Sequence, residues 1–99
     1  MAVATRLTDA EIAARLPALR GWTLAAGKLH RAFTFGNFAE AWAFMSAVAL
    51  AAEAMGHHPE WSNVWNRVTV DLTTHDAGGI SALDFDLAAR METLAGKRG

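Results

Sequence analysis

The chain has 99 residues, 53% of them hydrophobic, no cysteine and a formal net charge of −1, which together describe one small domain with a thin core. The missing cysteine excludes thiolate catalysis and cysteine-based zinc ribbons, and the balanced charge argues against direct nucleic-acid binding through a basic surface. The longest apolar stretch, residues 41–52, is shorter than the roughly 20 residues of a membrane span, and residues 1–10 lack the apolar core of a signal peptide. We therefore expect a single cytoplasmic domain over residues 1–99 without membrane contact.

The first predicted element is a short helix near the N-terminus. Thr8 and Glu11 have the spacing of a capping box, in which a hydroxyl at the N-cap and a carboxylate three residues later bind each other's backbone amides. Ile12 and Leu16 fall on one face of this helix, and Pro17 is expected to end it.

Two strands joined by a tight turn are predicted next. Residues 22–24 and 29–35 are extended runs, and Gly27 between them suits the positive φ that a tight turn requires. Alternate side chains of the second run share one face, where a charged residue interrupts the apolar ones: Leu29, Arg31, Phe33 and Phe35.

A long helix follows, with Asn37 and Glu40 suited to cap its start and Gly56 its end. Apolar residues recur along it at spacings of three and four, as Phe38, Trp42, Met45, Ala49 and Ala52. Further apolar residues widen this surface beyond one stripe, namely Phe44, Val48 and Met55. In so small a domain, a helix that is apolar on several sides is expected to contact a partner as well as the core.

Residues 64–74 alternate with a period of two, which predicts a half-exposed antiparallel strand, alone or with a second strand beside it. Ser81 and Asp84 form a second capping box, and Gly96 closes the helix that it opens. Its inward residues are predicted to be Leu83, Leu87, Met91 and Leu94. The fold class is therefore α+β, a two-layer sandwich with an antiparallel sheet of about four strands covered on one face by helices, in the order α-β-β-α-β-β-α.

Three of the four histidines fall in two predicted loops. His57 and His58 follow the long helix, and His75 follows the predicted strand. Loops of this kind can converge on one cleft, and imidazole exchanges protons near neutral pH. Glu53, about one helical turn before His57, can orient or charge-stabilise an imidazole. The pattern favours general acid–base chemistry.

Other interpretations of the same residues stay open. Three histidines could bind zinc, although two of them are sequence neighbours and lack the usual spacing of helical ligands. Capping alone would account for Asp84, and His30 within a strand is interpreted as structural. Trp61 and Trp65 either pack in a core or form the wall of a pocket for a flat ring.

The sequence around the histidines forms one long, gapped motif. Residues 53–61 read Glu-Ala-Met-Gly-His-His-Pro-Glu-Trp, and His75 and Asp84 follow at the expected distances. Residues 33–45 extend the similarity upstream, and Trp65 stands where tyrosine is frequent. Over nearly its whole length, the chain resembles the pterin-4a-carbinolamine dehydratase family, which is also known as a dimerisation cofactor of a homeodomain transcription factor.

The resemblance implies an enzyme that removes water from 4a-hydroxytetrahydropterin to give quinonoid dihydropterin, recycling the pterin cofactor of aromatic amino acid hydroxylases. It implies no metal, no bound cofactor, and assembly as a homodimer or homotetramer. By similarity, His57 and His75 are the catalytic acid–base pair, and His58 mainly binds substrate with support from Glu53. The other residues implied to shape the pterin pocket are Pro59, Trp61, Thr74 and Asp76.

Overall fold

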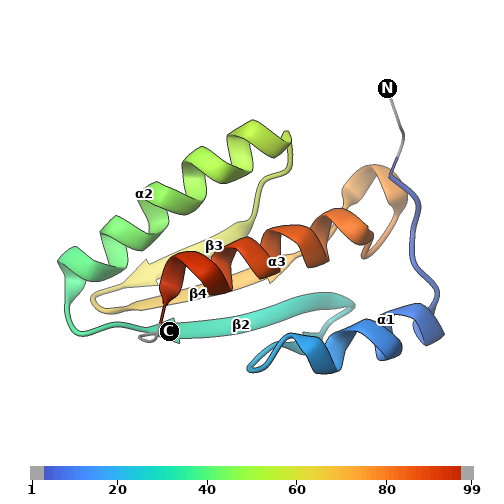
Figure 1. The fold of residues 1–99 in the computed structure, drawn as a ribbon, viewed down its shortest axis with the longest axis horizontal. Helices are drawn as coiled ribbons and strands as arrows, with labels where there is room; N and C mark the ends of the chain where they lie inside the picture. The colour runs from blue at the N-terminus through green and yellow to red at the C-terminus, as the bar shows by residue number, and fades with distance from the viewer. Residues whose placement is uncertain (1–3, 97–99) are drawn as a thin grey trace.

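The computed structural model describes residues 4–96, which form three α-helices, two short 3-10 helices and four β-strands (Figure 1). In chain order these are α1 (Asp9–Arg15), η1 (Leu16–Ala18), β1 (Thr23–Ala25), β2 (Lys28–Thr34), α2 (Phe38–Met55), β3 (Glu60–Val64), β4 (Arg67–Leu72), η2 (His75–Ala77) and α3 (Ala82–Ala95). The strands make one antiparallel sheet in the order β1-β2-β4-β3, and α2 and α3 cover one of its faces (Figure 1). The predicted α+β sandwich and its element order are confirmed.

Local capping interactions place the ends of the helices where the sequence predicts them. Thr8 accepts a hydrogen bond from the Glu11 amide at 3.1 Å, and the Glu11 carboxylate accepts one from the Thr8 amide at 2.9 Å. The hydrogen bond from the Thr8 amide lowers the pKa of Glu11. Gly56 ends α2 with φ of 64°, a left-handed conformation that glycine adopts without strain.

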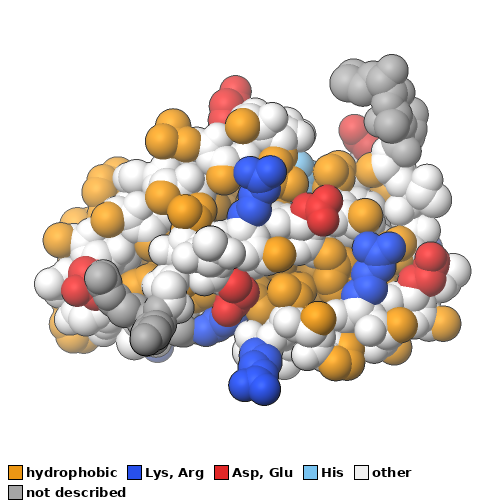
Figure 2. Space-filling view, in the orientation of Figure 1, with side chains coloured by type: hydrophobic (Ala, Val, Ile, Leu, Met, Phe, Trp, Pro, Cys, Tyr) orange, Lys and Arg blue, Asp and Glu red, His pale blue; other side chains and the backbone are white. Residues whose placement is uncertain are grey.

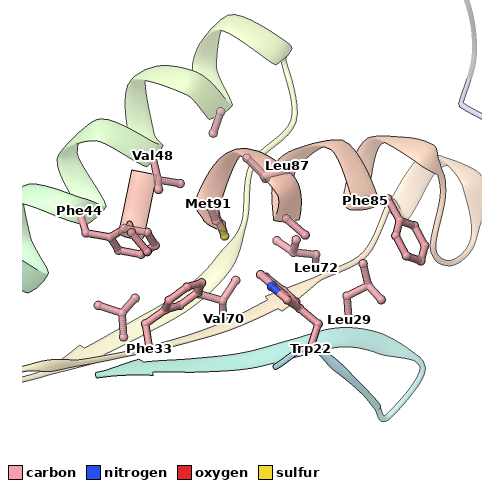
Figure 3. Close-up of a cluster of buried hydrophobic side chains, with 14 of the residues drawn as sticks. Trp22, Leu29, Phe33, Phe44, Val48, Val70, Leu72, Phe85, Leu87 and Met91 are labelled. Carbon is pink, nitrogen blue, oxygen red and sulfur yellow. The ribbon is translucent and has the colours of Figure 1, made fainter. Parts of the chain in front are cut away.

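The core lies between the sheet and the two long helices. Phe33, Val70 and Leu72 point from the sheet toward Val48 of α2 and Met91 of α3, and all five are fully buried (Figure 3). Alternation along β2 and β4 supplies this face of the sheet, because successive side chains of a strand point to opposite sides.

Arg31, the charged residue on the inward face of β2, has partners in the helical layer. Its guanidinium lies 4.3 Å from the centre of the Phe33 ring and forms an ion pair with Glu92 of α3. The same carboxylate accepts a hydrogen bond from the indole nitrogen of Trp22 at 2.8 Å. The interruption in the apolar pattern therefore joins the β1–β2 hairpin to α3.

The prediction of one strand over residues 64–74 is wrong in its extent. The chain reverses at Trp65 and Asn66, so that Val64 ends β3 and pairs with Arg67 at the start of β4. Trp65 has φ of 50° and Val64 is exposed, so Val64 does not share the buried face of Val68. The turn contains no glycine or proline, which is why the residue pattern does not reveal it.

Helix α3 buries a different set of residues from the one predicted. Leu87 and Met91 are buried as expected, but Leu83 is only partly buried and Leu94 is exposed. The remaining inward positions belong to Asp84, Phe85, Ala88 and Ala95. The buried face thus follows a spacing of three and four residues through Asp84, Leu87 or Ala88, Met91 and Ala95, and Leu83 and Leu94 fall at its edges.

Helix α2 has one buried and one exposed apolar face. Its buried residues are Ala41, Phe44, Val48 and Ala52. Phe38, Trp42 and Leu50 are 51%, 58% and 76% exposed, and hydrophobic side chains are visible over α2 in Figure 2. This 18-residue helix has a mean hydropathy of 1.3 and, by length and composition alone, is long and apolar enough to cross a membrane. The sequence analysis did not predict this, because it considered only the shorter apolar run of residues 41–52.

Candidate active site

The segments after α2 and after β4 meet at one end of the sheet. Because β3 and β4 are antiparallel, with Glu60 opposite Asp71, residues just before β3 lie next to residues just after β4. There they form an open cavity of about 250 Å³ that is lined by Gly56, His57, His58, Thr73, Thr74, His75 and Asp76. The three histidines that the sequence analysis singled out therefore share one cavity.

His57 is the buried member of the three, with only 8% of its surface exposed. The left-handed Gly56 reverses the chain so that the His57 amide donates to the carbonyl of Ala52 at 3.1 Å. The imidazole Nε2 of His57 lies 2.6 Å from Oδ1 of Asp84. A carboxylate only accepts hydrogen bonds, so Nε2 carries the proton in this contact.

Asp84 is fully buried and has hydrogen-bond donors on both carboxylate oxygens. Oδ2 accepts from the Thr74 hydroxyl at 2.7 Å and from the Ser81 amide at 2.9 Å, while Oδ1 faces His57. A buried charge of this kind is tolerated only when it is well supplied with partners. The predicted capping role is confirmed, and Asp84 additionally fixes the orientation of the His57 ring.

His58 and Glu53 form an exposed pair beside the cavity. The His58 Nε2 lies 2.8 Å from Oε1 of Glu53, and both side chains are mostly exposed. Glu53 itself does not line the cavity. The carboxylate that the sequence placed one turn before His57 contacts the following histidine instead.

His75 begins η2, and 80% of its side chain is exposed. Its Nε2 lies 3.1 Å from Oε2 of Glu60, whose other oxygen is 2.5 Å from Nζ of Lys28. The hydrogen bond from Lys28, with a further contribution from His75, lowers the pKa of Glu60 and keeps this carboxyl ionised. Thr74 and Asp76, both predicted binding residues, line the cavity on either side of His75.

The aromatic and proline residues of the motif lie outside the cavity lining. Trp61 is opposite Val70 on the helix-covered side of the sheet and packs against the hydrophobic core. Pro59 is half-buried in the connection between α2 and β3. Trp65, at the hairpin turn, is 65% exposed at the far end of β3. A direct contact of Pro59 or Trp61 with a ligand stays a prediction.

Two of the site's carboxylates were not assigned to it by residue pattern. Asp84 contacts a histidine 27 residues away, and Glu60 contacts one 15 residues away. The sequence signals for Asp84 were its capping-box spacing and its place in the motif, and Glu60 appeared only as one residue of the motif, with no role assigned to it. Within residues 4–96, no group of three or more His, Cys, Asp and Glu side chains is arranged to hold a metal ion.

The three cavity histidines share one arrangement: each has Nε2 against a different carboxylate, which orients the ring. Such groups can deliver a proton to a ligand in the cavity and accept another from it. The arrangement is chemically suited to proton transfer.

Comparison with known proteins shows what this chain is similar to. A family model described as pterin 4 alpha carbinolamine dehydratase matches residues 5–94. A protein of Solibacter usitatus, provisionally named as a pterin-4-alpha-carbinolamine dehydratase, is 56% identical over 92% of this chain and 96% of its own length. A relative from Rhizobium leguminosarum with the same provisional name is 51% identical over 95% of each chain.

Two solved structures share the fold. The transcriptional coactivator/pterin dehydratase of Brucella melitensis is 44% identical, with a TM-score of 0.90 over 93% of this chain and all of that one. A pterin dehydratase-like protein, identified as a RuBisCO assembly factor in the alpha-carboxysome, is 30% identical, with a TM-score of 0.63 over 76% of this chain and 87% of that one.

Proposed function

The chain belongs to the pterin 4 alpha carbinolamine dehydratase family, and we propose that it removes water from 4a-hydroxytetrahydropterin by histidine acid–base catalysis to give quinonoid dihydropterin. The family and the names of its relatives indicate the dehydratase activity. The observation that carries the catalytic part is the convergence of His57, His58 and His75 on one cavity. Its volume of about 250 Å³ is slightly below the roughly 300–1,000 Å³ of drug-sized ligand sites, which suits a compact two-ring substrate.

The reaction requires one acid and one base. The bond between C4a and the hydroxyl oxygen breaks, and the leaving oxygen takes up a proton and departs as water. N5 loses its proton, and its electron pair forms the C4a–N5 double bond. Positioned imidazoles perform both transfers near neutral pH, each contributing roughly 10²–10⁴-fold to the rate. No covalent intermediate is required.

We assign the two transfers to His57 and His75. His57 is fixed from the interior by Asp84, which acts as its positioning residue, and His75 reaches the same cavity from the loop after β4. His58, with Glu53 behind it, is assigned to substrate binding. Thr74 and Asp76 complete the lining, and Pro59 and Trp61, which lie outside it, are assigned to pterin binding on the family resemblance.

The direct test is whether the protein accelerates dehydration of the carbinolamine. An aromatic amino acid hydroxylase generates the substrate in situ, and its ultraviolet signature is followed with and without this protein. We expect the signature to decay faster as protein is added. Decay at the spontaneous rate at every protein concentration would overturn the proposal.

A physiological role in recycling the pterin of such hydroxylases, in the cytoplasm, follows from this activity as part of the proposal. The test is a deletion strain, which should accumulate products of the undehydrated pterin when a hydroxylase is active. Normal pterin turnover in that strain would argue against the recycling role.

The exposed face of α2 supports a second proposal, assembly of the chain as a homodimer or homotetramer. Phe38, Trp42 and Leu50 present a large apolar surface that an isolated domain leaves in water. Sedimentation should give a species of two or four chains, and Trp42→Glu should shift it toward the monomer. A monomeric wild type at micromolar concentration would contradict assembly.

A protein-binding role beside catalysis is a further candidate, favoured by the same α2 surface and by the description of the Brucella melitensis relative as a coactivator. Binding to a defined partner that survives loss of His57 and His75 would support it. Binding that disappears with those two histidines would argue that the cavity alone is used.

A further inference from the structure

Three charged or titratable side chains from separate elements meet beside the cavity, and one of them, His75, lines it. Lys28 begins β2, Glu60 begins β3 and His75 begins η2. The strand order places β4 between the first two, so Glu60 reaches across the sheet end to Lys28. The sheet therefore brings this cluster together from residues that are distant in sequence.

The Glu60 carboxylate divides its two oxygens between its neighbours. Oε1 accepts from Lys28 Nζ at 2.5 Å, and Oε2 accepts from His75 Nε2 at 3.1 Å. The Lys28 contact restricts rotation of the carboxylate and leaves Oε2 facing the imidazole. The contact with Lys28 is thus what makes Glu60 a fixed acceptor.

His75 differs from His57 in that burial does not hold its ring. Its side chain is 80% exposed, and within residues 4–96 its ring has Glu60 as its hydrogen-bond partner. An exposed imidazole without a partner samples several rotamers and both neutral tautomers. A hydrogen bond at Nε2 selects one tautomer, in which Nδ1 is the nitrogen left to exchange a proton with a ligand.

We propose that Glu60 is a positioning residue for His75, and that Lys28 holds the Glu60 carboxylate in place for it. This role rests on the proposed dehydratase function. It extends the arrangement of His57 and Asp84 to the exposed side of the cavity, with an ion pair replacing burial as the means of fixing the carboxylate.

A matched control lies on the same face of the sheet. His30 and Asp71 form a histidine–carboxylate pair at 2.9 Å, with side chains 35% and 34% exposed, and neither lines the cavity. Asp71 also lies close enough to Lys28 to interact with it electrostatically. Replacing Asp71 therefore removes a nearby negative charge without removing a contact to His75.

The test combines kinetics with nitrogen NMR of the His75 ring, assigned by comparison with His75→Gln. In Glu60→Ala we expect kcat to fall about tenfold with KM changed less than twofold. In Lys28→Met we expect kcat to fall about threefold. When the His75 ring is neutral, its nitrogen chemical shifts should show the proton on Nε2 in the wild type and a mixture of the two tautomers in Glu60→Ala. Asp71→Asn should leave both readouts as in the wild type.

Each other outcome overturns the proposal. Unchanged ring nitrogens in Glu60→Ala mean that Glu60 does not orient His75, even if kcat falls. An unchanged kcat with altered ring nitrogens means that the orientation has no catalytic use. If the wild type shows no dehydratase activity, the proposed function fails, while the ring nitrogens still decide whether Glu60 sets the tautomer of His75.

Discussion

His57 and His75 line the same cavity but are held by different kinds of surroundings. His57 is buried against Asp84, which also binds Thr74 and the start of α3, so this side of the site is part of the core. His75 lies in water and is held by Glu60, an exposed residue. Changes on the first side should therefore cost stability and activity together, whereas changes on the second should cost activity alone.

The largest effect is expected from Asp84→Ala. This change removes the acceptor of the Thr74 hydroxyl, the Ser81 amide and His57, and it breaks the capping box of α3. Breaking a buried, hydrogen-bonded charge pair costs about 3–5 kcal/mol of unfolding free energy. Urea denaturation measures it, with Asp86→Ala on the exposed side of α3 as the control, expected within about 0.5 kcal/mol of wild type. A loss below about 1 kcal/mol for Asp84→Ala would show that the two sides of the cavity do not differ.

His75→Ala should separate activity from stability on the exposed side. We expect the dehydration rate constant to fall roughly 10²–10³-fold, within the range of general acid–base catalysis, while the urea midpoint stays at its wild-type value. The control is His30→Ala, which removes a histidine that is paired with a carboxylate on the sheet but does not line the cavity, and it should leave the rate unchanged. A marked shift of the midpoint in His75→Ala would mean that this loop also contributes to the core.

Thr74→Val tests the hydrogen-bond network that joins His57, Asp84, Thr74 and Ser81, because valine has nearly the same shape as threonine but no hydroxyl. The substitution removes the hydroxyl that donates to Asp84 and lies 2.7 Å from the Ser81 hydroxyl, so a buried polar group loses a partner. We expect a loss of about 1–3 kcal/mol in unfolding free energy. Thr69→Val, on a half-buried strand position away from the cavity, is the matched control. Equal effects of the two substitutions would contradict a special role for the network.

The smallest effect concerns the titration of Glu60. The hydrogen bond from Lys28 lowers the pKa of this carboxyl, so the ion pair is present above the ordinary glutamate range and is lost as the pH falls through the lowered value. In Lys28→Met the pKa should rise toward its usual range, and the contact with His75 should be lost at a higher pH. Carbon NMR of the side-chain carboxyl measures the titration directly. The same midpoint in both proteins would show that Lys28 does not control Glu60.

The sequence predicts best what neighbouring residues decide. Thr8 with Glu11 and Ser81 with Asp84 form the capping boxes expected of them, because each box involves only residues three apart. Alternation along residues 29–35 gives the buried face of β2 for the same reason. The tight turn at Trp65 escapes prediction because tryptophan at a φ of 50° carries no sequence signal.

The site is harder to predict, since its contacts join residues that only the sheet brings together. The histidines can be recognised by type and by the family motif, and the structure places all three on one cavity. The partners of His57 and His75 depend on where α3 and β3 pack. The spacing of Asp84 from Ser81 therefore predicts only that it caps a helix, and nothing in the residue pattern singles out Glu60. Trp61 looks like a pocket residue from its position in the motif, but the register with Val70 places it on the core side.

The most direct measurement is the rate of carbinolamine dehydration by the double variant His57→Gln, His75→Ala, with circular dichroism to show that it remains folded. The amide of glutamine at position 57 reaches the place of the imidazole Nε2, so it keeps a donor toward the buried Asp84 carboxylate and limits the structural cost. If these two imidazoles carry the proton transfers, the double variant will not exceed the spontaneous rate. Dehydration at the wild-type rate by the folded double variant would contradict the mechanism.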